Sequence, residues 1–294
     1  MIRALFVHAH FDDFEFTAAG TFELWRRQRG SDFVGRVLVC TDGSAGHHFR
    51  SRRDTAALRL REQEASARLG GYEFQLLQLP GGSAPREACL QISTPLLAAL
   101  WKAIRDFQPD YLFCPPVVNE PLAGLHNDHQ TVAEAVRRVA YMINVPHAFV
   151  EEYPTDETLS TPCKLPTIVH VYDGYQFGAN GFDLAVNTES TFDLISEMTW
   201  CHASQIQEWL PWVGRHKMNP PTSLAEWKGT LRERFLRRND ELGVATRDYT
   251  EVFTLTAWGD VPTLEQIRQD WPPLDPAISR LAPLGQRLIR WRAC

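Results

Sequence analysis

The sequence contains no apolar run that approaches the roughly 20 residues needed to span a bilayer, so no transmembrane helix is predicted. It also lacks an excess of basic residues: the net charge is -6, which argues against nucleic acid or an anionic membrane as a partner. The chain enters a predicted strand almost at its N-terminus, and we therefore expect no signal peptide. No internal repeat or low-complexity tract is present.

The six cysteines are scattered and show no paired CxxC spacing, so neither a disulfide framework nor a cysteine zinc knot is expected. A reducing cytoplasm is the simplest location for such a chain. The remaining composition, 44% hydrophobic and 22% charged, is that of an ordinary globular protein. The 294 residues are enough for one large domain or two small ones, and a homo-oligomer stays open.

Short apolar runs alternate with amphipathic stretches over most of the chain. Strands are predicted at residues 2–7, 35–40, 74–79, 111–114, 167–172, 182–186 and 249–255. Helices are predicted at residues 17–29, 56–69, 94–107, 131–143, 191–209 and 225–237, and residues 211–223 have the composition of a loop. This alternation predicts an α/β fold: a Rossmann-like three-layer α/β/α sandwich with a mostly parallel sheet and a C-terminal elaboration.

Polar clusters follow two of the predicted strands. The first strand runs into His10-Phe11-Asp12-Asp13, and the loop after the fourth strand contains His126-Asn127-Asp128-His129. Because open α/β sheets place their ligands at the carboxyl ends of the strands, we expect the two clusters to meet at one edge.

The residue types in these clusters suit a metal-dependent hydrolase. His10 and His129 offer imidazole nitrogens and Asp13 offers a carboxylate, a set that suits zinc with one position left open for water. A metal in such a site lowers the pKa of its water towards ~7. Asp12 is the candidate general base. His126 could stabilise the oxyanion or protonate the leaving group, with Asp128 holding its ring.

These motifs resemble those of the PIG-L/LmbE family of zinc-dependent N-acetylglucosaminyl deacetylases. His10-Phe11-Asp12-Asp13 resembles the family's His-Pro-Asp-Asp signature, and the cluster at 126–129 resembles its His-Pro-Asp-His signature. Further similar segments occur in the family's order, at residues 41–43, 61–65, 202–205 and 249–253. The resemblance covers roughly residues 2–255 of the chain.

The resemblance implies the fold, the reaction and the roles of several residues. It implies an LmbE-like deacetylase domain at residues 1–255, with residues 256–294 as an extension packed on it. His10, Asp13 and His129 match the ligands of Zn²⁺, for which Fe²⁺ is an alternative. Asp12 matches the general base and His126 the second catalytic histidine. Arg61 matches a substrate-binding residue. The implied substrate is a small N-acylated amino-sugar conjugate, usually N-acetylglucosamine, from which acetate is released.

Three places depart from the family pattern, and at one of them Pro80-Gly81-Gly82 lacks the aspartate that is common near that point. Phe11 replaces the usual proline, and Phe14 replaces the acidic residue that commonly follows the aspartate pair. A carboxylate lost from the pocket wall and two aromatic rings gained there would suit a less ordinary amide.

Other interpretations compete with the deacetylase. Two histidines and one carboxylate also describe the iron(II) oxygenase site, in which Asp12 rather than Asp13 would be the ligand. A third hypothesis is a sugar-conjugate-binding α/β protein that keeps the metal site but catalyses no reaction.

Some of the polar residues also have structural interpretations. Asp12 and Asp128 are favoured helix caps. His8, His147, His170 and His216 have no partner pattern and are interpreted as structural residues.

Overall fold

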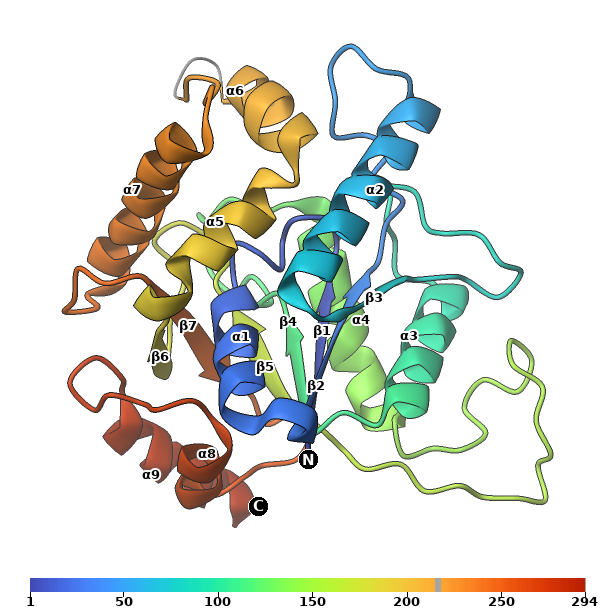
Figure 1. Ribbon diagram of the computed structural model, residues 1–294. Coiled ribbons are helices and arrows are strands. Elements are labelled where there is room, and N and C mark those ends of the chain that lie inside the picture. The colour runs from blue at the N-terminus through green and yellow to red at the C-terminus, as the bar shows by residue number, and fades with distance from the viewer. Residues whose placement is uncertain (215–217, 294) are drawn as a thin grey trace.

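A seven-stranded sheet forms the centre of the computed structural model, which describes residues 1–214 and 218–293 (Figure 1). From one edge to the other its strands are β3 (Glu73–Leu76), β2 (Phe33–Val39), β1 (Ile2–His8), β4 (Tyr111–Cys114), β5 (Thr167–Val171), β7 (Thr250–Leu255) and β6 (Leu184–Asn187). The neighbouring strands from β3 to β5 are parallel, and β7 runs antiparallel to both β5 and β6. The predicted α/β fold with a mostly parallel sheet is confirmed.

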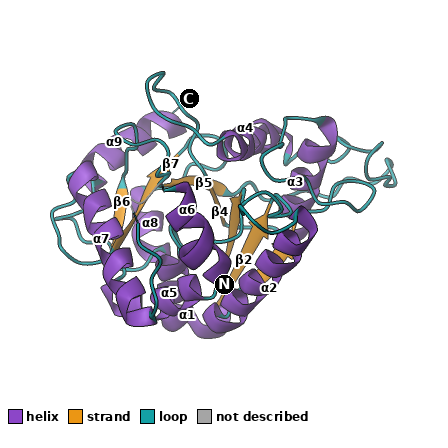
Figure 2. Cartoon of the chain, turned by 90° about the horizontal axis from the view of Figure 1, so that it is seen from above, coloured by secondary structure: helices purple, strands orange, loops and turns teal. Residues whose placement is uncertain are grey.

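Helices cover both faces of the sheet (Figure 2). On β1, Ala4 and Phe6 belong to one buried cluster, whereas Leu5 and Val7 belong to another on the opposite face. The first cluster lies under α1 (Ala19–Arg29), α2 (Arg52–Gly70), α5 (Phe192–Trp200) and α7 (Leu224–Leu242). The second lies under α3 (Thr94–Phe107) and α4 (Asn127–Met142). Strands buried on both faces read as continuous apolar runs, which explains why they stand out in the sequence.

The ends of several helices are set by local sequence. Ser51, Ser93 and Ser223 precede α2, α3 and α7, and each side chain accepts a hydrogen bond from a backbone N–H of the first turn. Gly71 and Gly243 end α2 and α7 in the left-handed conformation, which glycine adopts without steric cost. These caps fix where the two helices that face the site begin and end.

The helix predicted over residues 191–209 is interrupted. α5 ends at Trp200, a π-helical segment spans Ser204–Trp209, and α6 (Leu210–Val213) follows inside the predicted loop. The physical reason lies in α2: the backbone N–H of Ser204 donates to Glu62 at 2.8 Å, and its hydroxyl donates to the same carboxylate at 2.6 Å. A side chain from another helix thus takes a backbone donor that a continuous helix would use itself.

The C-terminal residues add two helices, α8 (Leu264–Asp270) and α9 (Leu281–Arg292), to the first of these clusters. The ring of Trp271 lies 5.1 Å from that of Trp25, whose indole N–H donates to the carbonyl of Asp270 at 2.6 Å. Because Trp25 stands on α1, this contact ties the tail to the first βα unit.

The described cysteines, Cys40, Cys89, Cys114, Cys163 and Cys201, are free thiols. Cys294 and His216 lie outside the described residues. Among residues 1–214 and 218–293, no helix combines the length and apolar composition that a membrane crossing requires.

We expect Trp271→Ala to destabilise the protein by about 3–5 kcal/mol, because a large buried ring that packs on Trp25 is removed. Urea unfolding followed by fluorescence measures the loss. Ile289→Ala is the control, since Ile289 on α9 is 72% exposed and should change stability by less than about 0.5 kcal/mol. An equally small effect of both changes would mean that the tail does not share the core.

Candidate metal centre

Two buried phenylalanines anchor the turn after β1. The ring of Phe14 lies 5.1 Å from that of Phe6 and 5.0 Å from that of Phe22. Phe11 packs against the turn after β2 so closely that a Cβ on Gly43 would lie 2.4 Å from its ring. Both rings are in the core, which corrects the expectation that they line the pocket. They hold the turn in place and leave the aspartate pair between them to face the site.

The three predicted ligands converge. His10 Nδ1 lies 3.1 Å from His129 Nε2 and 3.5 Å from Asp13 Oδ2, and His129 Nε2 lies 3.5 Å from Asp13 Oδ1. Ligand atoms held at ~2.1 Å around a tetrahedral ion are separated by roughly 3.4 Å. The two polar clusters therefore meet beyond the carboxyl ends of β1 and β4, as expected. Asp13, and not Asp12, contacts both histidines.

Each of the two histidines also contacts a second carboxylate. His10 Nε2 lies 3.2 Å from Asp128 Oδ2, and His129 Nδ1 lies 3.2 Å from Asp173 Oδ2. A carboxylate on one ring nitrogen fixes the tautomer and turns the lone pair of the other nitrogen outward, as in histidines that bind metals. These second contacts leave His10 Nδ1 and His129 Nε2 facing each other. Two groups of side chains at this place could hold a divalent metal: His10 with His126 and His129, and His129 with His8 and Asp13.

Asp128 holds His10 and not His126, which corrects the role expected from the sequence. Its carboxylate is fully buried and accepts hydrogen bonds from the backbone N–H groups of Ala88, at 2.6 Å, and Leu90, at 3.2 Å. Burial alone would raise the pKa of Asp128, but the hydrogen bonds from His10 and Ala88 outweigh it and lower the pKa to about 2. The carboxylate is thus kept ionised beside His10.

His126 caps α4. Its Nδ1 accepts a hydrogen bond from the backbone N–H of Asp128 at 3.2 Å, which assigns the proton of the neutral ring to Nε2. The ring centroid lies 4.6 Å from that of His10 and 4.9 Å from that of His129. Burial, followed by the charges of those two rings, lowers the pKa of His126 to about 4. A neutral imidazole with a free N–H beside the cluster can donate a hydrogen bond to a developing oxyanion.

Asp12 has a strained backbone, with φ 84°, which non-glycine residues adopt rarely and mostly at functional sites. Its backbone N–H donates to Gln63 at 3.1 Å, and its Oδ1 lies 3.3 Å from Nη2 of Arg59. Burial raises the pKa of Asp12 to about 6, against the opposing effect of Arg59. Both partners come from α2, so this helix sets where the carboxylate points.

Arg59 occupies the position expected of Arg61. Arg61 is exposed on α2, which removes the basis for expecting it at the substrate. Arg59 is 2% exposed; it donates to the carbonyl of Phe11 at 2.6 Å and forms an ion pair with Glu87 at 3.0 Å. Of these two residues of α2, Arg59 is the one that lies beside the aspartate pair.

Two further residues of the cluster were missed by sequence reasoning. His8, interpreted as structural, is buried, and its Nδ1 lies 2.5 Å from Asp13 Oδ2. Burial lowers the pKa of His8, against the raising effect of Asp13. Asp173 comes shortly after β5, so the strand-end rule applied to the first and fourth strands could have found it. For His8 the available signal was its place at the end of a strand, two residues before His10.

The carboxylate expected to be missing from the turn is present one residue later. Glu15, next to Phe14, is fully buried and accepts hydrogen bonds from Ser66 at 2.5 Å and Tyr72 at 2.7 Å. His202, also fully buried, has its Nε2 3.4 Å from Glu15. This carboxylate holds the turn through its buried partners and does not line the cavity.

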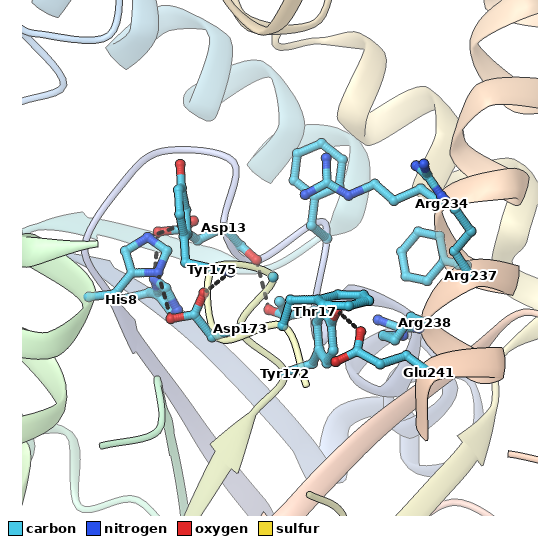
Figure 3. A pocket seen from close by; sticks show the side chains of 15 residues that line it. His8, Asp13, Thr17, Tyr172, Asp173, Tyr175, Arg234, Arg237, Arg238 and Glu241 are labelled. Carbon is cyan, nitrogen blue, oxygen red and sulfur yellow. Dashed lines mark hydrogen bonds and ion pairs between the residues drawn. The ribbon is translucent and has the colours of Figure 1, made fainter. Parts of the chain in front are cut away.

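A cavity of about 400 Å³ opens beside the cluster. Figure 3 shows His8, Asp13 and Asp173 on one side of it and the arginines of α7 on the other. Thus one end of the cavity is lined by Asp13 and His129, two of the three candidate ligands, and the remaining space can take a small molecule.

Residues 5–140, which include both polar clusters, match the family described as PIG-L: GlcNAc-PI de-N-acetylase. No curated protein matches the chain.

Several solved structures share the fold of this chain. An N,N'-diacetylchitobiose deacetylase from Pyrococcus horikoshii is 21% identical with a TM-score of 0.63, covering 86% of this chain and 83% of its own. The 4-carboxy-2-hydroxymuconate hydratase GalB from Pseudomonas putida is 16% identical with a TM-score of 0.61, covering 87% and 96%. The conserved protein TT1542 from Thermus thermophilus is 17% identical with a TM-score of 0.60, covering 87% and 94%. At these identities the similarity shows the fold, which proteins with different reactions share.

We expect Asp173→Asn to weaken zinc binding by about 10- to 100-fold, because the change removes the charge that orients His129. Competition with a chromophoric chelator measures the affinity. Asp193→Asn is the matched control, since the side chain of Asp193 is 82% exposed on α5. Equal zinc affinity of the two variants would exclude Asp173 as a support of the metal centre.

Proposed function

We propose that the chain is a zinc-dependent N-deacetylase that removes an N-acetyl or other N-acyl group from an N-acetylglucosamine-type conjugate. The observation that carries the proposal is the convergence of His10 Nδ1, His129 Nε2 and the Asp13 carboxylate within 3.5 Å of one another. These three residues are the proposed ligands. When bound, a divalent metal would supply an activated water near neutral pH and an electrophile for the amide carbonyl.

Asp12 is the proposed general base. Its carboxylate stands next to the ligand Asp13 in sequence, and its pKa of about 6 suits a group that accepts a proton from water near neutral pH. The Arg59 guanidinium, 3.3 Å away, holds the carboxylate in one orientation. His126 is the proposed second catalytic group: its Nε2–H would stabilise the oxyanion or give its proton to the leaving amine.

Asp128, Asp173 and Arg59 act as positioning residues in this proposal. The first two hold the rings of His10 and His129, and Arg59 holds Asp12. Zinc is the proposed metal, with Fe²⁺ as the alternative. The cytoplasmic location and the oligomeric state stay predictions.

Specific observations argue against each of the competing functions. An iron(II) oxygenase would use Asp12 as a ligand, but Asp13 is the carboxylate within 3.5 Å of both histidines. A hydratase shares the fold, so the fold alone does not select the reaction; the PIG-L match over residues 5–140 favours deacetylation. A non-catalytic binding protein would not need a half-buried carboxylate with a raised pKa, such as Asp12, beside the ligands.

The experiment that tests the proposal is acetate and amine release from a panel of N-acetylglucosamine conjugates, with zinc or Fe²⁺ added to the purified protein. We expect one bound metal per chain and equal amounts of acetate and free amine. A chain that binds the conjugates and the metal but releases no acetate would be a binding protein. A chain that binds neither metal would contradict the proposal altogether.

Asp12→Asn should keep the metal and lower the rate by about 10²- to 10⁴-fold, because the proton acceptor is lost while the ligands stay. Metal content and turnover are measured on the same sample. Asp106→Asn, a change at a side chain that is 58% exposed on α3, is the control for the loss of one negative charge. Full activity of Asp12→Asn would show that the general base is another group.

A further inference from the structure

α2 holds both polar atoms of the peptide group that joins Phe11 to Asp12. The carbonyl of Phe11 accepts a hydrogen bond from Nη2 of Arg59 at 2.6 Å. The backbone N–H of Asp12 donates to Oε1 of Gln63 at 3.1 Å. Arg59 and Gln63 are four residues apart, so their side chains lie on one face of the helix. The plane of this single peptide group is therefore set by one helix.

The residue that follows this peptide group has the strained backbone described above. The φ of Asp12, 84°, is a rotation about the bond between its N and Cα atoms, and that N atom belongs to the peptide group held by α2. L residues avoid this conformation, which persists only where the surrounding contacts determine it. The two contacts with α2 are of this kind. Without them Asp12 would relax to a negative φ, and its carboxylate would turn in another direction.

The side-chain amide of Gln63 has one favourable orientation. Its Nε2 donates to Oε1 of Glu15 at 3.0 Å and to the hydroxyl oxygen of Tyr72 at 2.7 Å. The same Glu15 oxygen accepts hydrogen bonds from the hydroxyls of Ser66 and Tyr72. Turning the amide over would bring the Gln63 carbonyl against this carboxylate, and its NH₂ group against the N–H of Asp12. Glu15 thus directs Oε1 of Gln63 toward Asp12.

The proposed ligand Asp13 is held by other contacts. Its Oδ2 accepts the backbone N–H of His10 at 2.8 Å and lies 2.5 Å from Nδ1 of His8, and neither partner belongs to α2. Gln63 and Glu15 are fully buried, and the residues that line the cavity do not include them. The contacts from α2 therefore act on the residue next to the ligand, and they do so from outside the cavity.

We propose that Gln63 is a positioning residue for the general base: locked by Glu15, it clamps the peptide group before Asp12 and holds the carboxylate where it would accept a proton. The inference rests on the proposed function, in which Asp12 takes that proton from the attacking water. A general base works only within hydrogen-bond reach of the proton, and a misplacement of about 1 Å can cost 10²-fold in rate. Gln63 thus sets kcat through Asp12 without touching the substrate.

Two substitutions of Asp12 test the clamp without any substrate. Asp12→Gly should give the purified protein a Tm about 2 °C higher than Asp12→Ala, since glycine adopts a positive φ without steric cost. When Q63M is added to each, the backbone is free to relax, and the order should reverse because alanine loses less backbone entropy on folding. An unchanged difference, or no difference while Gln63 is present, would overturn the proposal. Q63N, too short to reach Asp12, makes the same comparison if Q63M does not fold.

Turnover tests whether the clamp acts on the general base. Q63M should lower kcat by about 10- to 100-fold and leave KM and the zinc content nearly unchanged. In a protein that already carries D12N, Q63M should change kcat by less than about twofold, because residues that act as a unit are not additive. An equal fold-loss in both backgrounds would mean that Gln63 does not act through Asp12.

Asn239→Leu is the matched control for the loss of a buried amide. Asn239 is fully buried on α7, and its Nδ2 donates to the carbonyl of Asp248 at 3.0 Å. N239L should lower the Tm as Q63M does, but it should retain the kcat of the wild type. A loss of kcat as large as that of Q63M would show that the rate follows stability, and it would contradict a specific role of Gln63.

The two experiments separate the failure of this inference from that of the proposed function. Acetate release that Q63M leaves unchanged, with the same order of Tm in both backgrounds, would reject the clamp and leave the deacetylase. A reversal of the Tm order by Q63M, with no acetate from any conjugate, would keep the clamp on Asp12 and reject the deacetylase.

Discussion

The carboxylate of Asp13 lies where the side chains of three histidines meet. Its Oδ2 is 2.5 Å from His8 Nδ1, accepts the backbone N–H of His10 at 2.8 Å, and lies 3.5 Å from the ring of the same histidine, while Oδ1 is 3.5 Å from His129. A carboxylate taken out of water needs such partners. The first and fourth strands are neighbours in the sheet, and this one group fixes how the loops that follow them meet.

The same negative charge determines the electrostatics of the site. Burial acts to lower the pKa of His10, but its hydrogen bonds with Asp128 and Asp13 prevail and raise the pKa to about 10. The carboxylates that raise this pKa also favour a divalent cation at the same place. The far end of the same cavity is lined by arginines of α7.

Much of the fold could be predicted because strands such as β1 and β4 are apolar runs between polar turns. The ligand loops could be predicted because parallel strands end at one edge of the sheet. The residues that support the site were not predicted, and the physical reason is different. The inner face of α2 is polar: Arg59, Glu62, Gln63 and Ser66 are buried at helical spacing, and a search for apolar periodicity does not detect such a face. The arginines of α7 look like ordinary solvated charges in the sequence, because only the fold brings that helix to the cavity.

The central claim is that His10, Asp13 and His129 hold one metal ion. A crystal grown with zinc and measured at the zinc absorption edge tests it most directly. The account predicts a single anomalous peak at about 2.0–2.2 Å from His10 Nδ1, His129 Nε2 and an Asp13 oxygen, with Asp12 outside the coordination sphere. A peak bound by Asp12 in place of Asp13, or no peak between the two histidines, would contradict it.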